Sequence, residues 1–505
     1  MIVKDIKIID ILQDGRGVGK AESKVYFIDG ASYGETCDIE ISKENKNFIE
    51  AKKLKTTQKS CHYTQPPCPY YYECGGCTIM DINYQQQLKL KTNLIKNAIK
   101  KTCKIDLDEI EIIPSRQLNY RNKIRLQVDE NGDLAYNKKA SNDLVAIEDC
   151  LLANEHIRKK LPQIQKISQD INKKFGKIIK EISIRSNGEK ILLNIYTKDE
   201  KTLYNYLKDK NKDFNINLTN KKSTLTIGDN YLIHRVKDKK FKISKDDFFQ
   251  VNDSQIENLY SEASQYLEKD KKLLDLFCGS GISSMALAND HIVGIEINKS
   301  AIKDAIENAE ANGLKDYKFI AKNANYIDQK FIKKEKIGTV TIDPPRAGLD
   351  KEIIKTLAKT QIKNIIYISC NPQTLARDIK RFMDRGYELK RIKAVDMFAQ
   401  SMHVETVALL SKLNTEHHLD IEIGEDELSE IDFSKDATYG EIKKYVLDKY
   451  GLKVSSLYIA QIKRKHGLIE RENYNISKKE NQRVPNCPEE KEKAIENALK
   501  WFGMI

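Results

Sequence analysis

Alternating apolar and polar positions divide residues 1 to about 56 into short strands separated by turns. An apolar run at residues 25–28 is typical of one such strand, and residues 14–19 form a turn with three glycines. Short strands with a glycine turn about every ten residues predict a small β-barrel. Arg16 and Lys20 flank a turn that a phosphate can approach, and an ordinary solvated hairpin explains them equally well.

The pattern changes along the rest of the chain. Residues 84–101 repeat leucine and isoleucine with helical spacing, and from about residue 255 to 412 strands alternate with helical stretches. Such alternation is typical of a parallel sheet. We therefore predict four regions: a β-barrel at 1–56, a central α+β domain at 57–235, an α/β domain at 236–412 and a small, mostly helical C-terminal extension at 413–505.

The C-terminal extension contains an acidic segment at residues 425–427 and then becomes rich in lysine. Two helical stretches, residues 438–446 and 454–465, flank a glycine turn and resemble a helix-turn-helix whose second helix ends in basic residues. A nucleic-acid contact and an ordinary solvated helix explain this basic end equally well. We assign it no catalytic role.

Composition narrows the class of protein. A chain of 505 residues, 40% of them apolar, is long enough for about three or four domains. No stretch approaches the length of a membrane span, and the first residues lack a signal-peptide pattern, so we expect a cytoplasmic protein. Ten cysteines without an export signal indicate thiols, metal ligands or catalysis. The net charge of +12 suits a polyanionic partner, although a lysine-rich composition alone is weak support.

Four cysteines and three prolines crowd into a short stretch before the first predicted helix. Cys68, Cys74 and Cys77 share this stretch with a Gly-Gly pair, which permits the tight turn that points two thiolates toward one centre. Cys150 and Cys61 are both candidates for a fourth ligand. Four thiolates hold either zinc or an iron–sulfur cluster, and their spacing alone does not choose between the two.

A strand that runs into a glycine turn, residues 273–281, is the first of two linked cofactor signals. Small residues let the backbone approach a ligand, and a helix predicted to start near Ile282 offers free N–H groups. The second signal is Glu296, at the end of the next predicted strand, where a carboxylate can accept both ribose hydroxyls of a nucleoside cofactor. No Gly-x-Gly-x-x-Gly follows the first strand, so S-adenosylmethionine (SAM) fits better than NAD. The competing interpretation of Glu296 is a solvated residue at a strand end.

Reactive groups follow further along the chain. Cys370 comes after an apolar strand and has polar neighbours, which argue against a cysteine that merely packs in a core. Arg346 stands where many amino-group methyltransferases carry an aromatic ring, and this argues against methylation of an exocyclic nitrogen. The segment 343–348 lacks the cysteine that RNA cytosine-5 enzymes commonly place there. The remaining pair, a thiol and the carboxylate of Glu405, fits C5 of uracil.

The chemistry explains why both groups are needed. Carbon 5 of uracil is too weak a nucleophile to take a methyl group unaided, but a Cys370 thiolate that adds to C6 activates it. Glu405 then serves as the base that removes the C5 proton, whereas His403 is better explained as structural. The uridine must be unstacked before a thiol meets C6, and residues 120–123 and Arg125 are candidate RNA contacts.

Together these motifs resemble the SAM-dependent RNA 5-methyluridine methyltransferases, in particular the 23S rRNA (uracil-5-)-methyltransferases, over roughly residues 1–412. The resemblance implies an OB-like TRAM barrel that binds RNA, a central domain with a [4Fe-4S] cluster and a Rossmann-like catalytic domain. It makes Cys370 the nucleophile and Glu405 the general base. It assigns SAM contacts to Gln250, Phe277, Glu296, Asn323 and Asp343, and cluster ligation to Cys68, Cys74, Cys77 and Cys150.

The sequence departs from the family pattern in three places. Asn323 stands where an aspartate is common, Ala399 and Ser401 replace the usual proline and threonine near Glu405, and residues 413–505 have no counterpart. The tRNA-directed relatives usually lack both the barrel and the cluster, so we predict that this protein acts on 23S rRNA, in a loop or unfolded segment. We also expect a monomer. The alternatives are the same chemistry on tRNA, a zinc-stabilised methyltransferase and a non-catalytic RNA-binding assembly factor.

Overall fold

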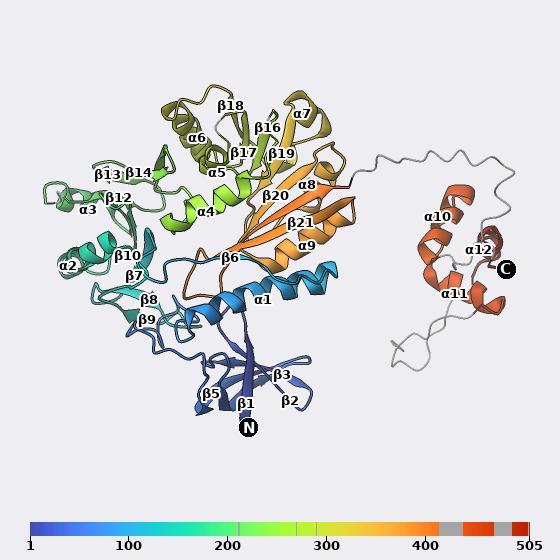
Figure 1. The fold of residues 1–505 in the computed structure, drawn as a ribbon, viewed down its shortest axis with the longest axis horizontal. Coiled ribbons are helices and arrows are strands. Elements are labelled where there is room, and N and C mark those ends of the chain that lie inside the picture. Colours follow the sequence, from blue (N-terminus) through green and yellow to red (C-terminus); the bar gives the residue numbers. More distant parts are fainter. Residues whose placement is uncertain (211–212, 269, 289, 414–437, 469–486, 503) are drawn as a thin grey trace. The chain divides into compact units, whose positions relative to one another are not determined.

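In the computed structural model, the first five strands close into a small barrel, as the alternating pattern predicts (Figure 1). The barrel interior is apolar and includes Ile6, Ile8, Ile28 and Ile39. Gly19 lets β2 approach this interior, because a Cβ at that position would lie 2.4 Å from Ile6 Cγ2. The strands are β1 (Ile2–Ile11), β2 (Gly17–Ala21), β3 (Lys24–Asp29), β4 (Thr36–Glu44) and β5 (Ile49–Gln58).

The structure describes residues 1–505 apart from 211–212, 269, 289, 414–437, 469–486 and 503. The chain forms two compact units, Met1–Asn414 and Thr415–Ile505. The acidic segment predicted to be part of the C-terminal extension, residues 425–427, lies outside the described residues. No described helix has both the length and the apolar character needed to cross a membrane.

A seven-stranded sheet in the order β13-β12-β11-β10-β7-β8-β9 forms the middle of the first unit. Helix α2 shares an apolar core with this sheet, in which Leu161 and Ile164 of the helix meet Ile182 and Ile184 of β10. The predicted mixture of strands and helices is therefore present. The elements are β7 (Lys123–Val128), β8 (Leu134–Asn137), β9 (Leu144–Ala146), α2 (Glu155–Phe175), β10 (Ile179–Ser186), β11 (Ile191–Thr197), α3 (Glu200–Leu207), β12 (Asn215–Thr219) and β13 (Thr224–Ile227), followed by a hairpin of β14 (Tyr231–Val236) and β15 (Lys239–Ser244).

An eight-stranded sheet in the order β18-β17-β16-β19-β20-β22-β21-β6 completes the first unit. Its central strands are parallel, as predicted, but β22 runs antiparallel to both β20 and β21. The expectation of a parallel sheet up to residue 412 is therefore wrong for this last hairpin. The strands are β6 (Ile112–Ile113), β16 (Lys272–Leu276), β17 (Ile292–Glu296), β18 (Tyr317–Ala321), β19 (Ile337–Ile342), β20 (Asn364–Ser369), β21 (Tyr387–Val395) and β22 (Glu405–Lys412).

Helices alternate with these strands and give the Rossmann-like α/β arrangement (Figure 1). Their apolar faces, exemplified by Ile354 of α8 and Leu375 of α9, join one core with Leu274 and Val340 of the sheet. The helices are α4 (Asp253–Ser264), α5 (Ile282–Leu287), α6 (Lys299–Ala311), the 3-10 helix η1 (Ala324–Tyr326), α7 (Gln329–Lys334), α8 (Lys351–Ala358) and α9 (Pro372–Met383).

Helix α1 (Tyr84–Cys103) packs against helix α9 of the C-terminal α/β region although it precedes the central sheet in the chain. Asn83 caps its start by accepting the N–H of Gln86 at 3.0 Å. Ile95 and Ile99 then enter the same core as Leu375 of α9. Strand β6 follows α1 and pairs with β21. This early part of the chain therefore lies beside the hairpin that carries Glu405.

The described part of the second unit consists of helices α10 (Tyr439–Tyr450), α11 (Ser456–Lys465) and α12 (Glu489–Trp501). The first two are the helices predicted around the glycine turn, and Gly451 ends α10 in the left-handed conformation, with φ 66°. The third helix completes the core, because Ile495 packs with Ile442 and Ile459.

Candidate active site

The strand ends of the C-terminal sheet bring the predicted site residues to one edge. Phe277, Asp343 and Cys370 each follow directly after a strand, and Glu296 is the last residue of another. Leu276 is in register with Ile342 on the neighbouring strand. Because parallel strands end at the same edge, these four residues line the side of the sheet where open α/β folds bind ligands.

Glu405 reaches the same edge from the opposite direction. It is the first residue of β22, and Thr406 pairs with Ser369 at the end of β20. The antiparallel direction therefore places the start of β22 beside the end of β20, where Cys370 lies. A parallel strand would have carried Glu405 to the far edge.

The reacting groups influence one another electrostatically. Burial raises the pKa of the Cys370 thiol to about 11, Glu405 adds to this rise, and Arg346 opposes it. Burial also raises the pKa of Glu405 to about 8, with Asp343 adding and Arg346 opposing. The pKa of Asp343 rises to about 7 through burial and through nearby Asp275. In the free protein at neutral pH, the thiol and most of the Glu405 carboxyl therefore hold their protons.

The turn after Cys370 holds the segment that carries Arg346. Asn371 Nδ2 donates to the Arg346 carbonyl at 3.1 Å, and Thr374 Oγ1 donates to the same oxygen at 3.2 Å. Asn371 also caps α9 by accepting the N–H of Gln373 at 3.1 Å. One short turn thus fixes the thiol and the neighbouring cation together.

The glycine turn after β16 is tied to the sheet by a buried carboxylate. Asp275 accepts hydrogen bonds from the hydroxyls of Ser283 at 2.7 Å and Ser284 at 2.5 Å, so the start of α5 is fixed to the strand. Phe277 and Gly281 both have left-handed backbones, with φ 67° and 78°. The predicted helix near Ile282 is confirmed, since α5 begins there.

Gln250 lies on the segment before α4 and is almost completely buried. Its backbone is held by Asn122, whose Nδ2 donates to the Gln250 carbonyl at 3.0 Å. Its side-chain Oε1 is also buried and has no hydrogen-bond partner among the described residues. A buried polar atom without a partner is costly, so this amide fits a site that a polar ligand completes.

Glu296 and Asn323 occupy neighbouring strand ends with different local roles. Glu296 is half-buried, and its Oε1 accepts the N–H of Asn298 at 2.9 Å. Asn323 is exposed and caps the short helix η1 by accepting the N–H of Asn325 at 2.9 Å. Both residues therefore lie at the ligand-binding edge of the sheet. In the structure, the Asn323 side chain is the N-cap of η1.

The cysteines predicted as ligands surround one cavity in the central part of the first unit. Cys68, Cys74, Cys77 and Cys150 line it, whereas Cys61 lies in a different pocket. Among the described residues, no group of three or more histidine, cysteine or acidic side chains is arranged to hold a single metal ion. The thiols therefore gather around a space without converging on one point.

Two predicted RNA contacts are buried, so that expectation is wrong for them. Tyr120 donates its hydroxyl to the Ala399 carbonyl at 2.9 Å, and Asn122 donates to Asp253 Oδ1 at 2.6 Å. Tyr120 thus holds the loop between β21 and β22, and Asn122 holds the start of α4. Arg125 is exposed and forms an ion pair with Glu181.

His403 is largely buried beside the barrel. Gln13 Nε2 lies 3.4 Å from its Nδ1. Burial, together with the positive charge of nearby Arg346, lowers the pKa of His403 to about 4. The ring is therefore neutral at physiological pH.

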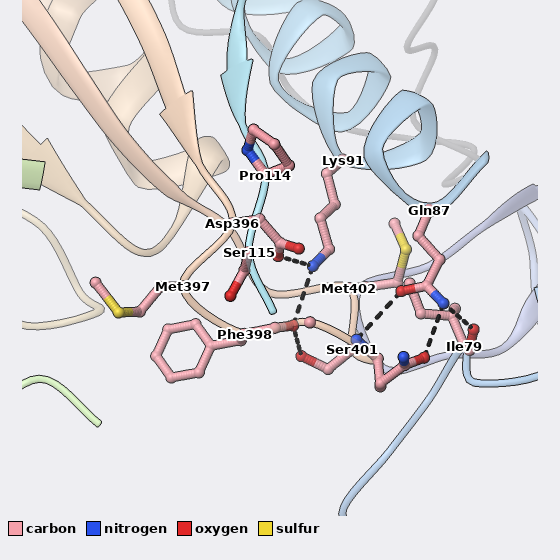
Figure 2. A network of polar contacts seen from close by, with 12 residues as sticks. Ile79, Gln87, Lys91, Pro114, Ser115, Asp396, Met397, Phe398, Ser401 and Met402 are labelled. Carbon is pink, nitrogen blue, oxygen red and sulfur yellow. Dashed lines mark hydrogen bonds and ion pairs between the residues drawn. The ribbon is translucent and has the colours of Figure 1, made fainter. Parts of the chain in front are cut away.

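A buried polar network around Lys91 and Asp396 escaped prediction (Figure 2). Lys91 of α1 pairs with Asp396 inside the protein, where both side chains are fully buried. A signal for this role exists in the sequence: Lys91 follows Leu88 by three positions and precedes Ile95 by four, so it falls on the apolar face of the helix.

Comparison with known proteins gives this site a family. The family described as tRNA (Uracil-5-)-methyltransferase matches residues 83–413. An uncharacterized RNA methyltransferase of Aquifex aeolicus is 33% identical over 414 residues, covering 79% of this chain and 96% of the relative. A similar relative from Oceanobacillus iheyensis is 32% identical, covering 80% of this chain and 95% of the relative.

A solved structure is also similar over most of the chain. It is the tRNA (uracil-54, C5)-methyltransferase of Pyrococcus abyssi in complex with S-adenosyl-L-homocysteine, with a TM-score of 0.65 and 26% identity. The similarity covers 81% of this chain and 99% of the Pyrococcus chain. These matches show that the chain belongs to the uracil-5 family of RNA methyltransferases.

Proposed function

We propose that this protein transfers the methyl group of SAM to C5 of a uridine in 23S rRNA. The observation that carries the proposal is the placement of a thiol and a carboxyl, Cys370 and Glu405, side by side at the ligand-binding edge of the sheet. Binding RNA without chemistry would require neither group. We expect the enzyme to act as a cytoplasmic monomer.

In the proposed mechanism, the Cys370 thiol first loses its proton to solvent, and the thiolate then adds to C6 of the uracil ring, so that electron density moves onto C5. SAM supplies the electrophilic methyl group that C5 attacks. Glu405 then accepts the proton of C5, and the sulfur leaves C6 as the ring double bond forms again. A positioned base of this kind typically contributes about 10²–10⁴-fold in rate.

Five residues are proposed to bind SAM. Gln250 supports this role with a side-chain oxygen that has no hydrogen-bond partner in the described part of the chain, and Glu296 supports it with a carboxylate at the strand end where ribose hydroxyls are commonly held. Phe277 and Asp343 follow the neighbouring strands. The full set is Gln250, Phe277, Glu296, Asn323 and Asp343.

We further propose that Cys68, Cys74, Cys77 and Cys150 hold a [4Fe-4S] cluster. Four thiols around a cavity suit a cluster better than zinc, because a single zinc ion needs its sulfurs to converge at about 2.3 Å. Protein purified without oxygen should contain iron and sulfide and absorb visible light, and Cys150→Ser should lose this absorbance. Stoichiometric zinc without iron would contradict the cluster.

The tRNA substrate is the second candidate, favoured by the similarity to the Pyrococcus tRNA enzyme. The motif resemblance to the 23S rRNA enzymes favours rRNA, but the barrel does not separate the two substrates, because the match to the tRNA enzyme extends over 81% of this chain, more than the first unit without its barrel. Mapping of 5-methyluridine in rRNA and tRNA from cells with and without the gene distinguishes them. Loss of the modification from tRNA alone would overturn the rRNA assignment.

The chemistry itself is tested with RNA that contains 5-fluorouridine. Fluorine cannot be removed as a proton, so the adduct between Cys370 and the methylated base should persist as a covalent protein–RNA complex. Its formation should require SAM, and Cys370→Ala should form none. If the parent protein binds the RNA and SAM but forms no adduct, the methyltransferase proposal fails and the assembly-factor alternative gains support.

A further inference from the structure

The loop between β21 and β22, residues 396–404, leads directly into Glu405. Val395, the last residue of β21, is in register with Glu405, the first residue of β22. The pair formed by Val395 and Glu405, the proposed general base, therefore closes the two ends of the loop. Asp396, the first residue of the loop, therefore directly follows the residue that pairs with Glu405.

A buried ion pair holds the start of the loop (Figure 2). Lys91 Nζ contacts Asp396 Oδ1, and neither side chain is exposed to solvent. The same ammonium donates to the Phe398 carbonyl at 3.0 Å. Tyr84 donates its hydroxyl to the other carboxylate oxygen of Asp396 at 2.7 Å. Buried charges are retained only with such complete pairing, so the geometry here is closely determined.

A second contact from the same helix holds the tip of the loop. Gln87 Nε2 donates to Gln400 Oε1 at 2.8 Å, and the Gln400 N–H donates back to Gln87 Oε1 at 3.1 Å. Gln400 has a left-handed backbone, with φ 69°. This conformation is unfavourable for a residue with a side chain and persists only where the surroundings impose it.

The cysteine-rich segment holds the far side of the loop. The Thr78 N–H donates to the Gln400 carbonyl at 3.0 Å, and Thr78 Oγ1 accepts the N–H of Met402 at 3.1 Å. Hydrogen bonds and an ion pair thus fix the loop at its first residues, at Gln400 and at Met402. None of the groups that make these contacts takes part in the proposed chemistry.

We propose that helix α1, through Lys91 and Gln87, sets the position from which Glu405 removes the C5 proton. Lys91 is thus a positioning residue for the second half of the reaction, an inference that rests on the proposed function. The turn at Cys370 has further contacts of its own, because Asn371 bonds to Ser369 and Arg346, and β20 pairs with β19 as well as with β22. Loss of the contacts from Lys91 and Gln87 to the loop should therefore slow removal of the C5 proton and leave addition of the thiol to C6 unchanged.

The test uses the double variant Lys91→Met with Asp396→Leu in the full-length protein. Replacing both charges by apolar groups avoids an unpaired buried charge. Lys89→Met is the matched control, because Lys89 lies on the same helix and is exposed. Each protein is assayed on uridine RNA and on 5-fluorouridine RNA, since only the first requires removal of a proton.

In the double variant, the rate of adduct formation with 5-fluorouridine RNA should stay within about twofold of the parent. Turnover of uridine RNA should fall by about 10²-fold, as expected for a displaced catalytic group, and the covalent intermediate should accumulate on this normal substrate. Lys89→Met should match the parent in both assays. An equal loss of both rates, or undiminished turnover, would overturn the inference.

Gln87→Met provides a milder variant if the double variant does not fold. It keeps the side-chain length and removes both contacts to Gln400, so turnover should fall by about tenfold with the same accumulation of adduct. Undiminished turnover in folded protein would overturn the inference. A parent protein that forms no 5-fluorouridine adduct would refute the proposed function instead, and the two failures are therefore distinct.

Discussion

At the scale of single residues, burial governs the chemistry of the proposed reacting pair. It raises the pKa of Glu405 to about 8 and that of Cys370 to about 11. A protonated carboxyl cannot accept the C5 proton, and a protonated thiol is a poor nucleophile. Arg346 is the neighbouring cation that opposes both shifts. Ionisation of these two groups should therefore limit activity near neutral pH.

We predict that kcat/KM for methylation rises with pH up to about 8, where Glu405 loses its proton. Above this pH the rise should be less steep, because only the Cys370 thiol still titrates. A pH profile with saturating SAM checks this. In the parent, adduct formation with 5-fluorouridine RNA needs no proton removal and should lack this change of slope, and a flat profile for methylation of uridine RNA would contradict the assignment.

Substitution of Gln250 should change the stability of the protein and its affinity for SAM in opposite directions. Gln250→Met keeps the length of the side chain but removes a buried oxygen that has no hydrogen-bond partner among the residues that the structure describes. The ligand-free protein should become more stable, by up to about 1–3 kcal/mol, while SAM should bind about tenfold more weakly. Denaturant unfolding and calorimetric titration measure the two effects. Unchanged SAM affinity in the folded variant would exclude Gln250 from the cofactor site.

At the scale of elements, strand direction and turn shape assemble the site. The antiparallel β22 brings Glu405 to Cys370, and the turn between β16 and α5 fits closely among its neighbours. A Cβ on Gly281 would lie 2.7 Å from Met285 Cε and 3.1 Å from Ala305 Cβ. This turn therefore requires glycine both for its left-handed backbone and for space.

Gly281→Ala should destabilise the protein more than Gly313→Ala. Both glycines have a left-handed backbone, but a Cβ at Gly313 meets nothing within 4 Å. Each substitution should cost about 1–2 kcal/mol for backbone strain, and overpacking should add about 1–3 kcal/mol at Gly281 alone. SAM affinity should fall only in Gly281→Ala. Equal unfolding midpoints and equal SAM affinities in the two variants would argue against this account.

At the scale of the whole molecule, each of the two units has its own apolar core. The family match ends at residue 413, before the second unit. All residues proposed for catalysis, SAM binding and cluster ligation lie in the first unit.

Removal of residues 415–505 should therefore leave methylation of an RNA substrate within about twofold of the full-length rate. The melting temperature of the first unit should stay within about 2–4 °C of its value in the full chain. Activity assays and calorimetry on both proteins check these values. A loss of methyl transfer in a folded truncated protein would assign the second unit a direct part in the reaction.

Much of the fold and of the candidate site was predictable from local patterns. Apolar periodicity indicated the barrel and the alternating strands and helices. Short motifs indicated that Phe277 and Cys370 directly follow a strand and that Glu296 ends one. The failures involved residues whose environment comes from distant segments. Tyr120 and Asn122 looked like surface RNA contacts because nothing nearby in the chain indicates that loops around residues 250 and 399 bury them.

The sequence alone determined which segments form helices or strands and which residues are candidates for the chemistry, because hydrophobic spacing and short motifs involve only a few neighbouring positions. Only the tertiary structure decided the direction of β22 and the contacts by which α1 holds the loop before Glu405. Lys91 and Asp396 are 305 positions apart, and their pairing depends on the burial of both charges when the core closes. No local pattern specifies which two charges meet in that way.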